Sequence, residues 1–297
     1  MRHLLSLADL SPEEIHQVLL SARMWKRHRK EWQTTKRPLE GETWALLFSK
    51  SSTRTRVSFE VGLREMGAQT LFLSASEIQM GRGEPIIDTA RVLGRMIHGA
   101  VIRTHAHADV ESFAQASGII TINALTDDEH PCQILADLLT WEELRGPIRG
   151  HRVTFIGDAA CNVARSWMLA ARLLSFDLIL AAPRAYWPSQ TEKNCTLTED
   201  VFQAAEGAHL LYTDVWVSMG MENEKQQRLR DFQGYQINEA LLDVANPDAL
   251  VMHCLPAYRG WEITDEAFEA HSATIFQQAE NRLHIQKAIV EFLTQWR

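Results

Sequence analysis

The feature that most constrains this chain is the regular alternation of short, predominantly apolar segments with longer segments of helical periodicity. The apolar runs lie at residues 43–49, 70–73, 99–104, 119–125, 151–158, 177–183, 209–215 and 249–255. Runs of this length are too short for globular helices, and they are typical of strands buried on both faces. Strands that alternate with amphipathic helices predict parallel sheets covered by helices. The sequence therefore predicts an α/β fold built from doubly wound parallel sheets.

Residues that begin and end helices divide the chain into two parts. A first helix is predicted from Ser11, where Ser11, Pro12 and Glu14 fit a capping box with proline in the first turn. A later helix over residues 130–146 is followed by Pro147 and Gly150, which break it before the next apolar run. With 297 residues, the chain has the length of two domains. We place the boundary between them near residue 130.

Composition excludes several classes of partner. The net charge is −8, so the molecule as a whole does not attract nucleic acid or an anionic membrane, and an anionic ligand needs a local basic cluster. No apolar stretch is long enough for a membrane helix, and the N-terminus does not resemble a secretory signal. The four cysteines form no CxxC pair and are expected to be reduced thiols. These features predict a cytoplasmic protein.

The first candidate site is a cluster of hydroxyl and basic residues where the apolar run at 43–49 ends and a helix begins. The cluster reads Ser49, Lys50, Ser51, Ser52, Thr53, Arg54, Thr55 and Arg56. Helix N-termini present backbone amides to anions, and the forked guanidinium groups of Arg54 and Arg56 fit phosphate oxygens. A capped surface helix with solvated arginines is the alternative. The position at the carboxyl end of a strand favours an anion site.

A second group of candidates lies at the end of two further strands. His130 and Gln133 open the predicted helix at 130–146, where both can donate hydrogen bonds to one oxygen, and Arg103 ends the run at 99–104. Capping of the local turn is the alternative role for His130 and Gln133. His105 and His107 have the spacing of metal ligands, but no nearby carboxylate or cysteine completes a set, so we interpret them as loop residues.

A third group belongs to the second half of the chain. Asp214 ends the run at 209–215, where its carboxylate suits a cationic amino group or caps a turn. Cys254 follows the last strand and is a candidate nucleophile, acid, base or small packing residue. The polar stretch at 218–236 is either a mobile lid or a solvated surface helix.

Five motifs occur in one order along nearly the whole chain: SSTRTR, HPCQ, DVWVSMG, HCLPAYRG and FQQAENRLHIQKA. Together they resemble the aspartate/ornithine carbamoyltransferase family. DVWVSMG and HCLPAYRG are similar to the segments that distinguish its ornithine-specific members from its aspartate-specific members. The resemblance implies transfer of the carbamoyl group of carbamoyl phosphate to the δ-amine of L-ornithine, giving L-citrulline and phosphate, with no metal and no redox cofactor.

The resemblance also implies an architecture of two α/β domains joined by helices. Residues 1–130 are expected to bind carbamoyl phosphate, residues 131–279 to bind ornithine, and the C-terminal helix at 280–297 to pack back on the first domain. A homotrimer or a multiple of trimers is expected. The enzyme is expected to serve amino-acid metabolism, in arginine biosynthesis or in citrulline breakdown.

Roles of single residues follow from the same resemblance. The residues expected to bind carbamoyl phosphate are Ser52, Thr53, Arg54, Thr55, Gln79, Arg103, His130, Gln133, Cys254, Leu255 and Arg282. Among these, the catalytic residues are expected to be Arg54, Arg103, His130 and Cys254. The residues expected to bind ornithine are Asn162, Asp214, Ser218 and Met219. Three positions depart from the family pattern: Cys161 and Arg165 replace asparagines, and Glu129 replaces an aromatic residue.

Other functions remain open on the sequence. The same chemistry could act on another amine, such as putrescine or a modified ornithine. A nicotinamide-dependent oxidoreductase shares the fold class, but the segment GDAACN lacks the glycines of the GxGxxG fingerprint. A catalytically silent regulator is a further alternative, which the intact motifs argue against.

Overall fold

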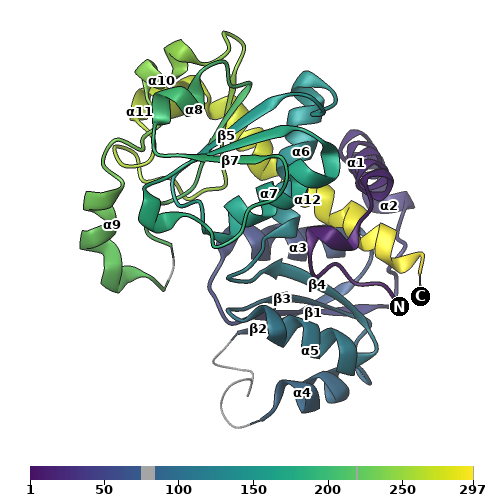
Figure 1. The fold of residues 1–297 in the computed structure, drawn as a ribbon. Helices are drawn as coiled ribbons and strands as arrows, with labels where there is room; N and C mark the ends of the chain where they lie inside the picture. The colour runs from purple at the N-terminus through teal and green to yellow at the C-terminus, as the bar shows by residue number, and fades with distance from the viewer. Residues whose placement is uncertain (75–83, 219, 297) are drawn as a thin grey trace. The chain divides into compact units, whose positions relative to one another are not determined.

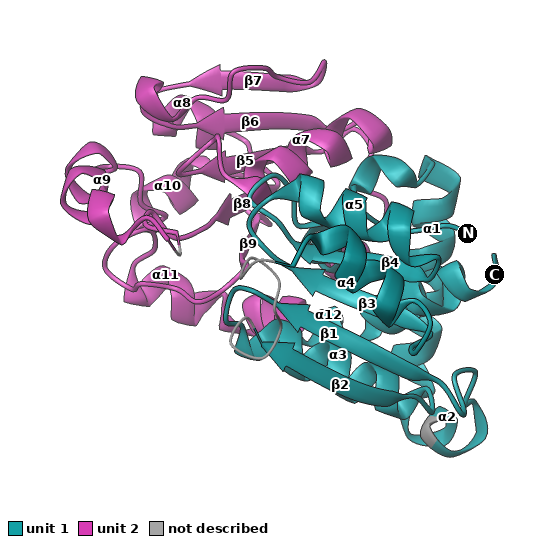
Figure 2. Cartoon of the chain, turned by 90° about the horizontal axis from the view of Figure 1, so that it is seen from below, with its two compact units in different colours: residues 1–139, 280–297 teal, residues 140–279 magenta. Residues whose placement is uncertain are grey.

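The structure, a computed structural model, describes residues 1–74, 84–218 and 220–296. The chain divides into two compact units, which are unit 1 (Met1–Leu139 and Glu280–Arg297) and unit 2 (Thr140–Ala279), as Figure 2 shows. Two helices each have residues in both units: α6 (Pro131–Arg145) and α12 (Ser272–Thr294). The units are described separately below.

Unit 1 is built on a four-stranded sheet in the order β2-β1-β3-β4, in which all neighbouring strands are parallel. The strands are β1 (Thr43–Phe48), β2 (Gln69–Ser74), β3 (Gly99–Arg103) and β4 (Ile120–Leu125). Phe48 of β1 pairs with Arg103 of β3, so both strands end at the same edge of the sheet. Residues that follow these strands therefore gather at one place.

Helices cover both faces of this sheet. Helices α4 (Ile86–Leu93) and α5 (His107–Ser117) lie on one face, and α3 (Thr53–Glu65) lies on the other (Figure 1). The first face is closed by a buried cluster from these helices and the central strands: Ala45, Leu47, Ala90, Ile97, Ala100, Ile102, Val110, Phe113 and Ile119. The near-continuous apolar strands are explained by this double cover, because neither face of β1 or β3 reaches water.

Close packing inside unit 1 explains two glycines. A Cβ atom at Gly99 would lie 2.5 Å from the indole ring of Trp44, its partner across β1 and β3, so only glycine fits beside that ring. A Cβ atom at Gly62 of α3 would lie 3.3 Å from the side chain of Lys287. Helix α3 therefore packs closely against the part of α12 that belongs to unit 1.

The N-terminal helices complete unit 1. Helix α1 (Pro12–Arg27) begins with the predicted capping box, in which Ser11 and Glu14 each accept a hydrogen bond from the other's backbone amide. A second helix, α2 (Arg29–Thr35), follows after one residue, and a short 3-10 turn, η1 (Leu7–Asp9), precedes α1. The residues at helical spacing on α1 are buried: Ile15, Val18, Leu19, Ala22 and Trp25.

Unit 2 contains a five-stranded parallel sheet in the order β7-β6-β5-β8-β9. The strands are β5 (Arg152–Ile156), β6 (Asp177–Ala181), β7 (Cys195–Thr198), β8 (Leu210–Thr213) and β9 (Leu250–His253). The apolar runs predicted four of these strands. Strand β7 was not predicted, because it is a short edge strand with no fully buried residue and only one strongly apolar side chain.

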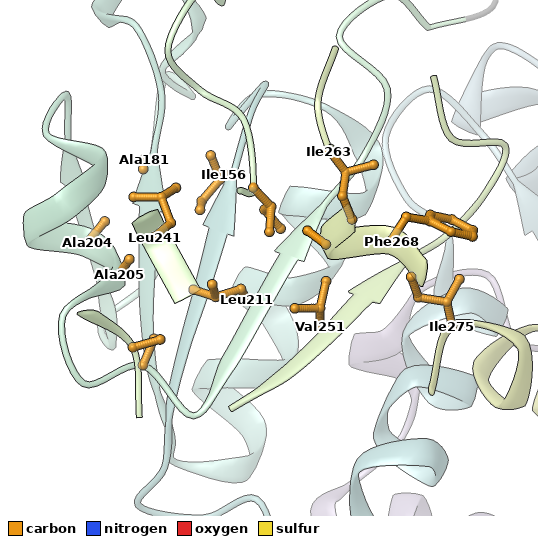
Figure 3. Close-up of a cluster of buried hydrophobic side chains, with 14 residues drawn as sticks. Ile156, Ala181, Ala204, Ala205, Leu211, Leu241, Val251, Ile263, Phe268 and Ile275 are labelled. Atoms are coloured by element: carbon orange, nitrogen blue, oxygen red, sulfur yellow. The ribbon is translucent and has the colours of Figure 1, made fainter. Parts of the chain in front are cut away.

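Alternation of side chains gives the two faces of this sheet different cores. On one face the rings of Phe155 and Tyr212 stack at 5.7 Å, and Trp167 meets Tyr212 edge-on at 5.2 Å. On the other face an aliphatic cluster includes Leu211 and Val251 from paired strands (Figure 3). The helices of unit 2 are α7 (Asn162–Leu174), α8 (Val201–Ala205), α9 (Lys225–Asp231), α10 (Glu239–Val244) and α11 (Asp265–Ala270).

The predicted fold class is confirmed, because each unit is a parallel sheet with helices on both faces. Two 3-10 turns, η2 (Arg184–Tyr186) and η3 (Glu222–Glu224), complete the elements of unit 2. Within the described residues, no helix combines the length and apolar character needed to cross a bilayer.

Candidate active site

The predicted phosphate-binding cluster lies where β1 passes into α3. Ser52 is the N-cap of α3, with an extended backbone, and its side chain accepts a hydrogen bond from the Thr55 amide (N···Oγ 3.3 Å). Thr53 and Arg54 occupy the exposed first turn. Because the dipole of the helix places positive charge at this end, the turn, its hydroxyls and Arg54 suit an anion.

A chain of buried hydrogen bonds joins Thr55 to helices α12 and α6 within unit 1. Arg282 donates through Nη2 to Thr55 Oγ1 (3.0 Å) and through Nη1 to Gln133 Oε1 (2.6 Å). Gln133 donates through Nε2 to Asp137 Oδ1 (2.8 Å). Because arginine can only donate and a carboxylate can only accept, the Gln133 amide must turn its oxygen towards Arg282 and its NH2 group towards Asp137. One of the two N–H donors of the Gln133 amide is thus bound to Asp137, and the expectation that Gln133 donates to the ligand stays a prediction.

His130 lies beside the same chain of hydrogen bonds and is 4% exposed. Burial lowers its pKa well below the usual value, and the nearby charges of Arg282 and Arg103 lower the pKa further. The imidazole is therefore neutral at physiological pH, which is the state that can donate a hydrogen bond without adding charge. Arg103 is also buried, and its carbonyl oxygen accepts from the Ser49 amide (2.8 Å).

We expect His130 to make the fold sensitive to acid. Its pKa in the folded state is below the usual 6.5, so its contribution to stability is present above that pH and is lost as the pH falls towards the lowered pKa. His130→Gln removes this group, so its unfolding free energy should fall less than that of the wild type between about pH 7 and about pH 5. Urea titrations at both pH values measure the difference, and an equal fall in both proteins would contradict this explanation.

Two buried charged residues beside this cluster were given no role from the sequence. Asp137 is fully buried and accepts from Gln133 four residues earlier on α6. Lys50 is 8% exposed and forms an ion pair with Asp127. The spacing of Gln133 and Asp137 on one helix face is a signal that could have revealed their contact. The pairing of Lys50 joins segments far apart in the chain and has no such local signal.

Glu129, one of the departures from the family pattern, has a structural role in unit 1. Its carboxylate accepts hydrogen bonds from Ser6 Oγ (2.6 Å) and from the Leu7 amide (3.1 Å). A parallel bridge between Leu4 and Ile122 lies in the same region. Burial raises the pKa of Glu129. This acidic residue therefore fastens the N-terminal segment to the stretch that precedes His130.

Glu129→Ala is expected to lower the unfolding free energy by about 1–3 kcal/mol, because the Ser6 hydroxyl and the Leu7 amide lose a partly buried acceptor. An exposed acidic residue of unit 2 offers a control, and Asp243→Ala should change stability by less than about 0.5 kcal/mol. Urea unfolding of both variants measures the effect. Equal changes in the two variants would show that the contacts of Glu129 do not stabilise the fold.

In unit 2, Asp214 and Cys254 meet at the carboxyl ends of neighbouring strands. Thr213 of β8 pairs with His253 of β9, so the residues that follow them lie side by side. Cys254 Sγ donates a hydrogen bond to Asp214 Oδ1 (2.9 Å), which also accepts from the Val215 amide (2.7 Å). The contact with the Asp214 carboxylate opposes negative charge on the Cys254 sulfur and therefore a role as thiolate nucleophile.

The start of α7 lies near the same carboxylate. Asn162 is the first residue of α7, and Cys161 is its N-cap, with Sγ accepting from the Ala164 amide (3.4 Å). Burial raises the pKa of Cys161 well above the usual value, and the charge of Asp214 raises it further. Arg165 lies three residues after Asn162, on the same side of the helix and partly exposed. The two departures from the family pattern therefore sit next to the predicted acceptor-binding residues.

The stretch at 218–236 contains helix α9, which supports the surface-helix interpretation over the lid. Arg228 of α9 is 5% exposed and donates through Nη1 to Asp158 Oδ2 (2.8 Å) and to the Trp216 carbonyl (3.1 Å). Ser218 is partly buried two residues after Trp216. The Arg228 guanidinium therefore fastens α9 to the segment that carries the predicted acceptor-binding residues.

The described residues cover most of the predicted site. Gln79 and Met219 lie outside them. Leu255 follows Cys254 with a left-handed backbone (φ 57°). In the parts of the chain that the structure describes, no group of three or more histidine, cysteine, aspartate or glutamate side chains is arranged to hold a metal ion. The structure brings two groups of predicted residues together: in unit 1 these are Thr55, Arg103, His130, Gln133 and Arg282, and in unit 2 they are Asn162, Asp214 and Cys254.

Comparison with protein families assigns both halves of the chain. Residues 2–143 match the carbamoyl-P binding domain of the aspartate/ornithine carbamoyltransferases, and residues 149–293 match their Asp/Orn binding domain. The chain belongs to the aspartate/ornithine carbamoyltransferase family. The resemblance inferred from the five motifs is thereby confirmed, and so is the class of enzyme.

Individual members of this carbamoyltransferase family are similar along their whole length. An ornithine carbamoyltransferase from Akkermansia muciniphila is 51% identical over 99% of this chain and 98% of its own, and one from Chromohalobacter salexigens is 47% identical over 98% and 97%. The crystal structure of an anabolic ornithine carbamoyltransferase from Campylobacter jejuni superposes with a TM-score of 0.93, at 39% identity and 100% coverage of both chains. The enzyme from Pyrococcus furiosus gives 0.92 at 43% identity, covering 98% of this chain and 96% of its own.

Proposed function

We propose that this chain transfers the carbamoyl group of carbamoyl phosphate to the δ-amine of L-ornithine, giving L-citrulline and phosphate. The observation that carries the proposal is the buried set of Thr55, Arg282 and Gln133 beside neutral His130 and Arg103, next to the start of α3. This set offers cationic and neutral donors for a ligand that has both a phosphate and a carbonyl oxygen. The names of the similar proteins support ornithine as the acceptor.

In this proposal each unit binds one substrate. Unit 1 binds carbamoyl phosphate, with the phosphate at Ser52, Thr53 and Arg54 and, from outside the described residues, Gln79. Unit 2 binds ornithine through Asn162, Asp214, Ser218 and Met219. Cys254 and Leu255 keep their expected role as carbamoyl phosphate contacts. The match of the two parts of the chain to a carbamoyl-P and an Asp/Orn binding domain supports this division.

The transfer needs an unprotonated amine and a polarised carbonyl group. As the amine attacks, negative charge grows on the carbonyl oxygen, and in this proposal Arg103, Thr55 and His130 donate hydrogen bonds to it. Donors fixed in advance in this way contribute roughly 3–4 kcal/mol each to stabilising a transition state. In this proposal the amide of Gln133 forms a hydrogen bond with the carbamoyl moiety. The departing phosphate stays against Arg54 and accepts the proton released by the amine.

The acceptor end requires recognition of an amino acid. The carboxylate of Asp214 is partly exposed and suits the α-ammonium group, and the start of α7 at Asn162 suits the α-carboxylate. Holding the amine in line with the carbonyl carbon removes much of the entropic cost of bringing two reactants together. The amine therefore needs no protein base if its proton passes to the phosphate.

A citrulline-forming assay with purified protein tests the proposal. Carbamoyl phosphate and L-ornithine should give citrulline and phosphate in equal amounts, and putrescine, aspartate and N-acylated ornithine should react at least about 10²-fold more slowly, because each lacks or blocks a group that the site binds. A faster reaction with putrescine than with L-ornithine would show that the proposed acceptor is wrong and that the proposed carbamoyl transfer is right. No carbamoylated product with any amine would reject the function.

The remaining expectations form part of the same proposal. We propose that the chain forms a homotrimer or a multiple of trimers, acts in the cytoplasm and serves arginine biosynthesis or citrulline breakdown. Unit 1 exposes apolar side chains that an interface would cover: Val57, Leu71, Val92 and Met96. Light scattering on the purified protein measures the mass of the assembly, and a monomer at micromolar concentration would reject the trimer.

A further inference from the structure

A buried histidine and glutamate lie directly behind the predicted catalytic segment of unit 2. His253 ends β9 and Glu262 follows nine residues later, and both side chains have 0% exposure. The two side chains are 3.0 Å apart, from Nε2 to Oε1. A carboxylate and an imidazole are seldom placed in a fully dry position without hydrogen-bond partners, so the partners of His253 and of Glu262 Oε1 identify what the pair holds.

The partners of the two groups are backbone amides of the segment that carries Cys254. The Leu255 amide donates to His253 Nδ1 (2.9 Å), and the Tyr258 amide donates to Glu262 Oε1 (2.6 Å). The amide of His253 itself donates to Gln278 Oε1 (3.0 Å). The pair therefore binds the turn after β9 at two points.

These contacts define the tautomer of the imidazole. Because a backbone N–H can only donate, Nδ1 of His253 must be an unprotonated acceptor. The ring proton is then on Nε2, where it donates to the carboxylate of Glu262. Glu262 thus fixes the tautomer of His253, and the tautomer in turn provides the acceptor for the Leu255 amide.

The segment needs such support because its conformation is unfavourable by itself. Leu255 has φ of 57°, in the left-handed region that non-glycine residues rarely adopt, so surrounding contacts must hold it there. Side chains alternate along a strand, so with His253 pointing into the core, Cys254 points the other way. There its thiol donates to Asp214 Oδ1 (2.9 Å).

We propose that His253 and Glu262 are positioning residues, which hold Cys254 and Leu255 in the conformation that carbamoyl transfer requires and thereby set the place of the Asp214 carboxylate. The inference rests on the proposed function. It goes beyond that function, because it attributes the conformation of Cys254 and Leu255 to a buried histidine–glutamate pair that contacts no substrate.

Two substitutions of His253 separate this role from general stability. His253→Asn keeps an oxygen that can accept from the Leu255 amide, whereas His253→Leu has a similar size and no acceptor. We expect kcat for citrulline formation to fall about 10²-fold in His253→Leu, since small misplacements near reacting groups have effects of this order, and less than about 10-fold in His253→Asn. The affinity for inorganic phosphate, which unit 1 is proposed to bind, should stay within about twofold in both variants.

A matched control lies at the opposite end of the same sheet. His209 precedes β8, and its Nδ1 accepts from the Arg152 amide (3.1 Å), so it supports a backbone amide in the same way but far from Asp214 along the strands. His209→Leu should lower the melting temperature and leave kcat within about twofold of the wild type.

The outcomes separate the inference from the proposed function. Equal losses of kcat in His253→Leu and His253→Asn, unchanged kcat in both, or parallel loss of phosphate affinity would overturn the positioning role. If His253→Leu does not fold, Glu262→Ala and Glu262→Gln carry the same comparison, because Gln keeps an oxygen that can accept from His253 Nε2 and from the Tyr258 amide, whereas Ala keeps none. We expect kcat to fall about 10²-fold in Glu262→Ala and less than about 10-fold in Glu262→Gln, and equal losses would overturn the positioning role. A wild-type protein that carbamoylates no amine would instead reject the proposed function.

Discussion

Arg54→Ala is expected to lower kcat/KM for citrulline formation by roughly 10²–10³-fold and to abolish tight binding of carbamoyl phosphate. Arg54 lies in the exposed first turn of α3, where the capped helix start already favours an anion. A guanidinium group adds two parallel hydrogen bonds and a full charge to that position, which alanine cannot replace. Steady-state kinetics and calorimetric titration with carbamoyl phosphate measure the two losses.

Arg56→Ala provides the comparison within the same motif. Two residues further along α3, the Arg56 guanidinium lies 3.6 Å from the centre of the Phe72 ring and its Nε is 3.2 Å from Glu60 Oε2. Its side chain is therefore held on the surface over β2, and its loss should change kcat/KM by less than about fivefold. Retained tight binding in Arg54→Ala, or equal losses in the two variants, would reject the phosphate site at the start of α3.

The fold was predictable because its signals are local. Strands buried on both faces are apolar along most of their length, as β1 and β3 are, so their runs stand out from the amphipathic helices around them. Strand β7 lacked that signal because an edge strand has one side open to solvent and needs less apolar surface. Helix α9 was predicted only as one of two alternatives, a surface helix or a mobile lid, since its charged sequence is equally compatible with a loop.

The candidate site was predictable only where a motif marked it. Thr55, His130 and Gln133 lie in motifs that could be read directly, and the structure adds that Arg282 bridges two of them. Supporting residues were missed because their partners are distant in the sequence or belong to the backbone. Glu262 is one example, since its two contacts are with an imidazole in another element and with a backbone amide. Burial of this kind leaves no pattern in the sequence.

The orientation of a side chain was also beyond the sequence. Gln133 was expected to donate to the ligand, and the structure shows in addition that its amide donates to the fully buried Asp137 and accepts from Arg282. Glu129 was visible only as a departure from the family pattern, and its contacts are with the N-terminal segment. In both cases the residue type was visible, while the direction of its hydrogen bonds depended on neighbours brought together by the fold.

Arg228→Ala is expected to lower the unfolding free energy by about 3–5 kcal/mol, the effect of removing one partner of a buried ion pair. Arg228 and Asp158 have side-chain exposures of 6% and 7%, with 2.8 Å between Nη1 and Oδ2. Without the guanidinium, the Asp158 carboxylate stays buried with an uncompensated charge, and the Trp216 carbonyl loses its donor. Urea unfolding followed by tryptophan fluorescence measures the loss.

Two further variants identify the cause of that loss. Arg230→Ala removes an exposed arginine of the same helix, bound to Gln227 at 2.8 Å, and should change stability by less than about 0.5 kcal/mol. Adding Asp158→Asn to Arg228→Ala removes the unpaired charge and should recover part of the stability, because a neutral amide is less costly to bury than a carboxylate. A double variant no more stable than Arg228→Ala would mean that the loss comes from packing of α9, and the ion pair would then not be what fastens this helix beside the acceptor-binding segment.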